Sequence, residues 1–208
     1  MSRGLGDVYK RQFIEGADIH RRTASEVFGV PFDEVTSEMR SAAKAVNFGI
    51  VYGISDFGLA RQLGISRKEA ARYIELYFMR YPGVHTYLKG CVERAKQQGA
   101  ATTLFGRRRE MPELKSSNYN TRSFGERVAM NMPIQGTAAD IIKLAMVRVH
   151  NELKARGMKS ELILQIHDEL IIDAMQEEAD AAAEILKSCV ENVVNLKVPL
   201  LAEVHTGH

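Results

Sequence analysis

The sequence predicts an α+β protein in which a mainly helical part comes first and a small antiparallel sheet follows. Three observations support this. Residues 36–98 consist of good helix formers interrupted by capping and stop signals. Two apolar runs surround a polar tip in ELILQIHDELIIDA, residues 161–174, which is typical of a buried β-hairpin. A helix over residues 176–194 and a final strand at PLLAEV, residues 199–204, are expected after it.

Capping residues delimit the first helices. Thr36 or Ser37 can accept hydrogen bonds at the start of a helix that runs through EMRSAAKAVNFGIVY and stops near Gly53. Ser55 can start a short helix that ends near Gly64. Two consecutive helices are therefore expected between residues 36 and 64.

Two more helices are expected up to residue 98. Ser66 and Glu69 have the spacing of a capping box, and the apolar residues after them predict a helix to about Tyr81, which Pro82 stops. A further helix is predicted from residue 84 to residue 98.

A first, shorter hairpin is expected between these helices and the hairpin at residues 161–174. The segment ATTLFGRRREM, residues 101–111, is predicted to turn at Gly106 and resembles a loop more than a core segment. From Asn118 to Arg156 the pattern is helical again, and we expect a break around Pro133.

The amino-acid composition limits the kinds of protein to which the chain can belong. The chain has 208 residues, of which 45% are hydrophobic and 26% charged, as in ordinary soluble globular domains. Cys91 and Cys189 form neither a disulfide framework nor a zinc pattern, which favours a reducing compartment. No apolar run approaches the roughly 20 residues needed to cross a bilayer, and the first residues lack a signal peptide. A cytoplasmic protein is expected. The net charge of +2 does not identify a partner.

The helix after Thr36 has two distinct faces. One narrow arc is apolar and suited to packing; it contains Met39, Ala43, Val46 and Ile50. The opposite face repeats every four residues with two cations and two aromatic rings, namely Arg40, Lys44, Phe48 and Tyr52. Periodicity alone is also compatible with a solvated face. Two cations beside two flat rings can, however, bind an anion and stack a base, and a nucleoside triphosphate offers both.

The spacing of these residues resembles a known motif. Arg40, Lys44, Phe48, Tyr52 and the glycines after the two rings match RxxxKxxxFGxxYG, which looks like motif B of family A DNA polymerases of the bacterial DNA polymerase I type. The resemblance implies that Arg40 and Lys44 contact the triphosphate, that Phe48 packs near its sugar, and that Tyr52 lies at the nascent base pair. In ADIHRRTASEVFG, His20 matches a phosphate ligand of the same family.

Carboxylates occur at the tip of the second hairpin. Adjacent residues of a strand point to opposite faces, so Asp168 and Glu169 are not expected to hold one ion equally, and we expect Asp168 to be the principal metal ligand. A polar turn closing an ordinary hairpin is the alternative. The triplet of His167, Asp168 and Glu169 resembles motif C of the family. This resemblance implies that Asp168 and Glu169 are catalytic, that Asp168 binds Mg²⁺ in a two-ion site of the complete enzyme, and that His167 approaches the primer end.

Amide and arginine side chains form a further set. Arg127, Asn131 and Gln135 recur every four residues and can reach minor-groove acceptors that all base pairs share. By resemblance these three and Gln165 contact template and primer. The arginines at residues 107–109 are expected to touch phosphate.

The resemblance also implies a domain organisation. Residues 13–100 correspond to the fingers and residues 101–208 to a partial antiparallel-sheet palm with connecting helices of a right-hand polymerase, whereas residues 1–12 look like a leader foreign to the family. No counterpart of motif A, which carries the other metal-bridging aspartate, is found. We therefore expect a C-terminal fragment that is inactive by itself and has a sheet edge or apolar face uncovered.

The implied parent extends primers on template DNA by nucleotidyl transfer from dNTPs in replication and repair. It is expected to be monomeric, free of membranes and associated with the nucleoid in the cytoplasm. Two alternatives stay open. A single-subunit RNA polymerase shares the architecture, and a non-catalytic nucleic-acid-binding module would bind DNA without metal or nucleotide.

Overall fold

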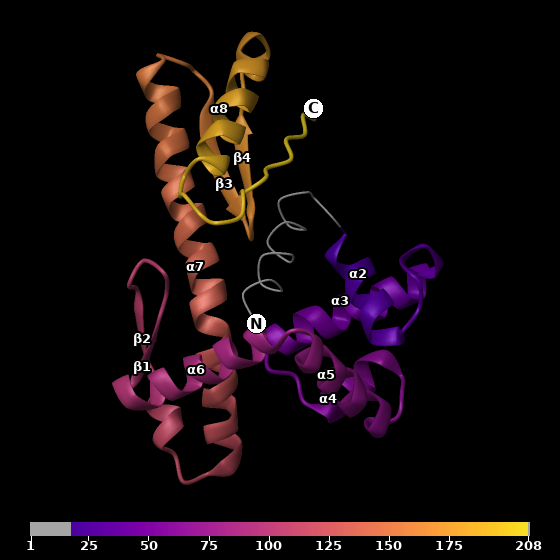
Figure 1. Cartoon of the computed structure of the whole chain (residues 1–208). Helices are drawn as coiled ribbons and strands as arrows, with labels where there is room; N and C mark the ends of the chain where they lie inside the picture. Colours follow the sequence, from indigo (N-terminus) through magenta and orange to yellow (C-terminus); the bar gives the residue numbers. More distant parts are fainter. Residues whose placement is uncertain (1–17, 208) are drawn as a thin grey trace. The chain divides into compact units, whose positions relative to one another are not determined.

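The computed structural model describes residues 18–207, which belong to two compact units (Figure 1). One unit ends at Gly136 and the other begins at Thr137, and each is described by itself. The predicted leader, residues 1–12, lies outside the described residues. Within the described part, none of the helices has the length and apolar character needed to span a bilayer.

The first unit is mainly helical. It contains a 3-10 turn, η1 (Phe32–Glu34), and the helices α2 (Ile19–Phe28), α3 (Ser37–Val51), α4 (Asp56–Leu63), α5 (Arg67–Arg80) and α6 (Pro82–Gln98).

The predicted helix starts are confirmed. Thr36 caps α3 by accepting a hydrogen bond from the backbone of Met39, and Ser55 caps α4. Ser66 and Glu69 form both halves of the capping box at the start of α5. Pro82 not only ends α5 but is also the first residue of α6, where its fixed φ and missing N–H fit the first helical turn.

The apolar face of α3 supports this unit. Ala43 and Val46 are fully buried and Ile50 almost so, while Met39 is half-buried against the same packing surface. Val46 and Ile50 join a core cluster in which Leu59 of α4 is fully buried. The face of α3 that was predicted to point inward does so.

A short hairpin follows α6, as predicted. Strands β1 (Ala100–Thr102) and β2 (Arg108–Glu110) pair antiparallel, with Ala101 opposite Arg109. Its base is part of a core, because Ala101 and Met111 are buried against Ala129. The segment therefore contributes more to the interior than a plain loop, and the 3-10 turn η2 (Pro112–Lys115) completes it.

The predicted break at Pro133 is wrong. Helix α7 runs without interruption from Tyr119 to Ala155 with the proline inside it. Proline removes a single backbone donor and disturbs one turn, whereas burial fixes the helix on both sides of that turn. Ala129 before the proline and Val149 after it are both fully buried, and this packing outweighs the local cost.

The second unit combines part of α7 with a hairpin and a helix. Strands β3 (Glu161–Ile166) and β4 (Glu169–Asp173) are antiparallel, and a 3-10 turn, η3 (Gln176–Glu178), leads into α8 (Ala179–Glu191). Figure 1 shows α8 beside the hairpin. The core of this unit contains Val149 and Leu153 of α7, Ala182 and Ile185 of α8, and Leu162 and Ile172 of the hairpin.

The hairpin was predicted correctly, but its burial was not. Its inner face packs on the helices, whereas the outward side chains of Leu164 and Ile166 are 48% and 44% exposed. A register shift lies between Leu162 and Leu164, and Ile163 within it is also exposed. Two strands with one covered face cannot bury both sets of alternating side chains. The expectation of an uncovered apolar face is confirmed.

The predicted strand at residues 199–204 is wrong. Within residues 18–207, neither β3 nor β4 pairs with this segment, which has no regular structure. The backbone N–H of Ala202 instead donates a hydrogen bond to the side chain of Glu191 at 3.1 Å. Apolar content suits a strand, but a strand also needs a partner for its backbone groups.

Candidate functional site

The predicted cationic and aromatic face of α3 is exposed. Phe48 and Tyr52 are 49% and 46% exposed, which is unusual for large rings, and Arg40 and Lys44 are exposed on the same side. The ammonium of Lys44 lies 5.9 Å from the centre of the Phe48 ring. One ridge of the first unit therefore presents two positive charges and two ring faces, as its four-residue repeat predicts.

His20 belongs to this ridge, although it comes from α2. Its ring centre lies 5.8 Å from that of Phe48. The amide nitrogen of Asn47 donates to Nδ1 of His20 at 3.0 Å, so the proton of the neutral ring is on Nε2. Burial, followed by the charges of Arg40 and Lys44, holds the pKa of His20 below its usual value. At neutral pH the ring is thus uncharged and presents an N–H donor.

Arg40 is tied to the start of α2 by Asp18. Oδ2 of Asp18 accepts a hydrogen bond from Nε of Arg40 at 2.6 Å. This contact, more than any other, holds the pKa of Asp18 below its ordinary value, although partial burial acts in the opposite direction. Arg40, His20, Phe48 and Lys44 therefore form a single connected surface.

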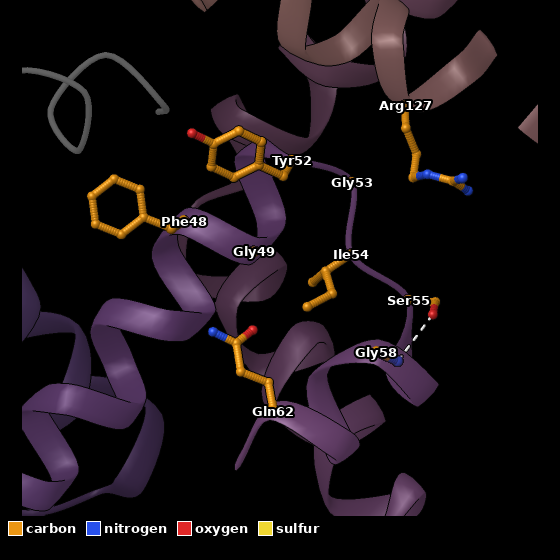
Figure 2. A pocket seen from close by; sticks show the side chains of 9 residues that line it. All are labelled: Phe48, Gly49, Tyr52, Gly53, Ile54, Ser55, Gly58, Gln62 and Arg127. Atoms are coloured by element: carbon orange, nitrogen blue, oxygen red, sulfur yellow. Dashed lines mark hydrogen bonds between the residues drawn. The ribbon is translucent and has the colours of Figure 1, made fainter. Parts of the chain in front are cut away.

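A hollow of about 490 Å³ lies at the C-terminal end of the ridge. Figure 2 shows Phe48 and Tyr52 at its α3 side, Gln62 of α4 below them and Arg127 of α7 opposite. The remaining lining residues are Gly49, Gly53, Ile54, Ser55 and Gly58.

Two glycines let the chain turn closely at this hollow. A Cβ at Gly49 would come within 2.8 Å of the Ile54 side chain. Gly53 has φ of +67°, and a Cβ there would lie 2.6 Å from Met130 and 2.9 Å from Arg127. Both glycines of the FGxxYG motif are therefore explained by sterics, because a larger residue would collide with the turn at Ile54 or, at Gly53, with α7.

Tyr52 is joined to the amide residues of α7. Nε2 of Gln135 donates to the Tyr52 hydroxyl at 2.6 Å, and Nδ2 of Asn131 donates to Oε1 of Gln135 at 3.2 Å. Arg127, one turn earlier, is a lining residue of the hollow. The structure therefore brings the predicted nucleotide-binding ridge and three of the predicted DNA-binding residues together in one unit.

The remaining predicted residues lie at the β3–β4 turn of the second unit. Ile166 pairs with Glu169, so His167 and Asp168 form a two-residue turn. His167 has φ of 54°, in the left-handed region that favours glycine. Nε2 of Gln165 donates to the carbonyl of His167 at 2.9 Å and fastens the tip. Asp168 and Glu169 are exposed, and Asp168 lies in the turn whereas Glu169 opens β4.

The fit of this turn to a metal ion is partial. Exposed carboxylate oxygens are the donors that Mg²⁺ prefers. Within residues 18–207, however, no group of three or more acidic, histidine or cysteine side chains is arranged to hold a metal. Asp168 and Glu169 can supply part of an oxygen ligand set, and further ligands are required.

Sequence reasoning missed Asp18 and Asn47, which orient the ridge. Asp18 lies at an N-cap position, so its acidic side chain before a helix was a detectable capping signal. Asn47 carried no such signal, because its partner lies 27 positions away. Among the predicted phosphate contacts at residues 107–109, Arg108 is paired with Glu110 at 2.7 Å, which partly neutralises it.

Comparisons with known proteins point to one family. A family model described as DNA polymerase family A matches residues 7–208, so residues 7–12 of the predicted leader fall inside the match. DNA polymerase I of Caldicellulosiruptor bescii is 57% identical over 195 residues, and that of Bacillus caldotenax 53%. These alignments cover 94% of this chain but only 23% and 22% of the relatives.

Among solved structures, the fold is similar to that of the POL domain of Pol1 from M. smegmatis, in complex with DNA primer-template and dNTP. The TM-score is 0.87 and the sequence identity 44%. The similarity covers 92% of this chain and 34% of that one. The chain thus spans less than a quarter of its curated relatives and about a third of the polymerase domain.

Proposed function

Because the chain belongs to DNA polymerase family A, we propose that it supplies the nucleotide-binding fingers, residues 13–100, and part of the palm, residues 101–208, of a DNA-directed DNA polymerase. The complete enzyme transfers nucleotides from dNTPs to the 3′-hydroxyl of a primer on template DNA. The observation that carries this proposal is the exposed ridge of α3, on which two cations and two rings lie beside His20.

The ridge has the chemistry that a dNTP requires. Arg40, Lys44 and the Nε2–H of His20 are donors for the triphosphate. Phe48 and Tyr52 offer ring faces for the sugar and the base, next to the hollow of Figure 2.

The proposed DNA contacts come from α7 and from the β3–β4 hairpin. The side chains that can donate to the minor-groove acceptors of template and primer are those of Arg127, Asn131, Gln135 and Gln165, and His167 approaches the primer end. The M. smegmatis complex with primer-template and dNTP supports DNA and deoxynucleotides over an RNA polymerase reading.

We further propose that Asp168, assisted by Glu169, holds Mg²⁺ in a two-ion site of the complete enzyme. Bound Mg²⁺ neutralises charge that develops on the transferring phosphate. The exposed carboxylates at the β3–β4 turn support this role for Asp168. We also propose that the complete enzyme acts in replication and repair as a monomer in the cytoplasm, at the nucleoid. The DNA polymerase I relatives support the first of these roles.

The 208-residue chain alone is expected to bind primer-template DNA but not to extend it. Binding is expected because the ridge and the α7 residues Arg127, Asn131 and Gln135 are assembled within one unit. Extension is not expected, because no counterpart of motif A, which carries the other metal-bridging aspartate, is found in the sequence. Fluorescence anisotropy of labelled primer-template, with and without dNTP and Mg²⁺, measures the first, and a gel-based extension assay measures the second.

The outcomes separate the alternatives. Nucleotide-dependent tightening on DNA supports the polymerase reading. DNA binding that neither dNTP nor Mg²⁺ alters would instead identify a non-catalytic binding module. Extension by the chain alone, abolished by Asp168→Ala, would contradict the predicted inactivity.

Replacing Arg40 by alanine is expected to weaken dNTP binding roughly 10- to 100-fold. A hydrogen bond to a charged group contributes about 1.5–3 kcal/mol, and each 1.4 kcal/mol is about a factor of ten. Calorimetric titration of the chain with dATP measures the change. Arg61→Ala, which removes an exposed cation from α4, is the matched control and should leave the dissociation constant within about twofold. Equal losses in both variants would mean that only overall charge attracts the nucleotide.

A further inference from the structure

Asp18 connects two of the proposed triphosphate ligands through one carboxylate. Oδ1 accepts hydrogen bonds from the backbone N–H groups of His20 and Arg21 at 3.1 and 3.0 Å, which caps α2. Oδ2 accepts the bond from Nε of Arg40 at 2.6 Å. The carboxylate therefore fixes the first turn of α2, which carries His20, to the guanidinium of α3.

This arrangement leaves the outer edge of the guanidinium available. The bond to Asp18 uses Nε, and among residues 18–207 no hydrogen bond engages the Nη atoms of Arg40. The side chain of Arg40 is 45% exposed, compared with 34% for Asp18. A guanidinium held at Nε cannot rotate freely, so its two Nη atoms keep a fixed direction and can bind an anion in a bidentate manner.

We propose that Asp18 is a positioning residue for the incoming nucleotide, which holds Arg40 by Nε so that its Nη edge is oriented toward the triphosphate. This inference rests on the proposed function of Arg40 as a triphosphate ligand. It assigns to Asp18 a role in binding phosphate although its own charge is negative.

Two opposing effects decide whether Asp18 strengthens or weakens binding of the triphosphate. The carboxylate repels a polyanion, but at an exposed position this repulsion acts through solvent and is screened by salt. Ordering a free arginine costs much of its rotamer entropy when the anion binds, and this cost does not depend on salt. Asp18 removes that cost in advance, so the positioning effect outweighs the repulsion at physiological ionic strength.

The test is titration of the chain with dATP, inorganic tripolyphosphate and deoxyadenosine. Asp18→Asn keeps a side-chain oxygen that caps α2, since asparagine is as good an N-cap as aspartate, but it removes the charge that holds Arg40. We expect roughly three- to tenfold weaker binding of dATP and tripolyphosphate and unchanged binding of deoxyadenosine. In an Arg40→Ala background the same substitution should no longer weaken binding, and it should tighten binding of dATP and tripolyphosphate slightly because only the loss of repulsion remains.

Removal of a negative charge by itself would tighten polyanion binding, so the predicted direction is opposite to that of bulk electrostatics. Tighter or unchanged binding in Asp18→Asn would overturn the proposal. Asp56→Asn is the matched control, because it breaks an ion pair of the same 2.6 Å length, with Arg67, at the start of α4. It should not weaken triphosphate binding.

Two further measurements separate this inference from the proposed function. If the unmodified chain binds neither tripolyphosphate nor dATP, the proposed function fails and the inference with it. The Nε–Hε signal of Arg40 in NMR tests the inference independently. It should be protected from exchange in the unmodified chain, lose that protection in Asp18→Asn, and stay protected when tripolyphosphate is added. Loss of protection on adding tripolyphosphate would show that Asp18 competes for Arg40, which contradicts positioning.

Discussion

Replacing Asp168 by alanine is expected to lower the primer-extension rate of a complete enzyme by at least about 10³-fold. The enzyme used for this test is a hybrid protein. In it, this chain replaces the matching 195 residues of the C. bescii relative, with which it is 57% identical. A metal ion contributes several kcal/mol of charge stabilisation in the transition state, and a thousandfold corresponds to about 4 kcal/mol. Single-turnover primer extension with saturating dNTP measures the rate.

The control is chosen on the same hairpin. Asp173→Ala removes an equal charge from the last, exposed residue of β4 and should change the rate by no more than about twofold. DNA binding, measured by anisotropy, should persist in both variants. If Asp168→Ala retained more than a tenth of the rate, the metal-binding role of this carboxylate would be wrong.

Replacing Leu59 by alanine should destabilise the first unit by about 2–5 kcal/mol. Leu59 is fully buried in the cluster that also contains Val46 and Ile50 of α3. A cavity here removes support from the apolar face of the helix whose opposite face carries the ridge. Urea unfolding, followed by circular dichroism at a helix wavelength, measures the loss in unfolding free energy.

Leu104→Ala provides the comparison, because the same atoms are removed from a side chain that is 67% exposed in the same unit. Its unfolding free energy should stay within about 0.5 kcal/mol of the original. A similar loss in both variants would mean that Leu59 is not part of a tightly packed core.

Local signals predicted most of the helices. Thr36, Ser55 and Ser66 cap helices as expected, because a cap depends on side chains within three residues of the helix start. The two faces of α3 were also predictable, since helical periodicity separates the buried Val46 from the exposed Phe48 without knowledge of the partners.

The predictions of secondary structure and burial were wrong where contacts with residues distant in the sequence decide the conformation. Pro133 carries a strong local break signal, yet burial on both sides keeps α7 continuous. The apolar residues 199–204 suit a strand, but no described strand pairs with them. The outer face of β3 was predicted to be buried because its residues are apolar, and composition does not indicate whether a covering layer exists.

The candidate site was predictable in part for the same reason. A four-residue repeat placed Arg40, Lys44, Phe48 and Tyr52 on one face of a helix, and the resemblance to motif B assigned that face to nucleotide binding. The hydrogen bonds that Arg40 donates to Asp18 and Gln135 donates to Tyr52 join residues 22 and 83 positions apart, and periodicity within a helix contains no information about such pairs.

The left-handed backbone of His167 has a consequence for the stability of the β3–β4 turn. A side chain in this conformation costs roughly 1–2 kcal/mol, so glycine would be preferred if only the strength of the hairpin mattered. The stability of the hairpin and the proposed approach of the His167 imidazole to the primer end therefore place opposite demands on this position. The strands on either side have to offset this cost, and their cross-strand pairing, from Glu161 with Asp173 to Ile166 with Glu169, limits how much backbone strain the turn can hold.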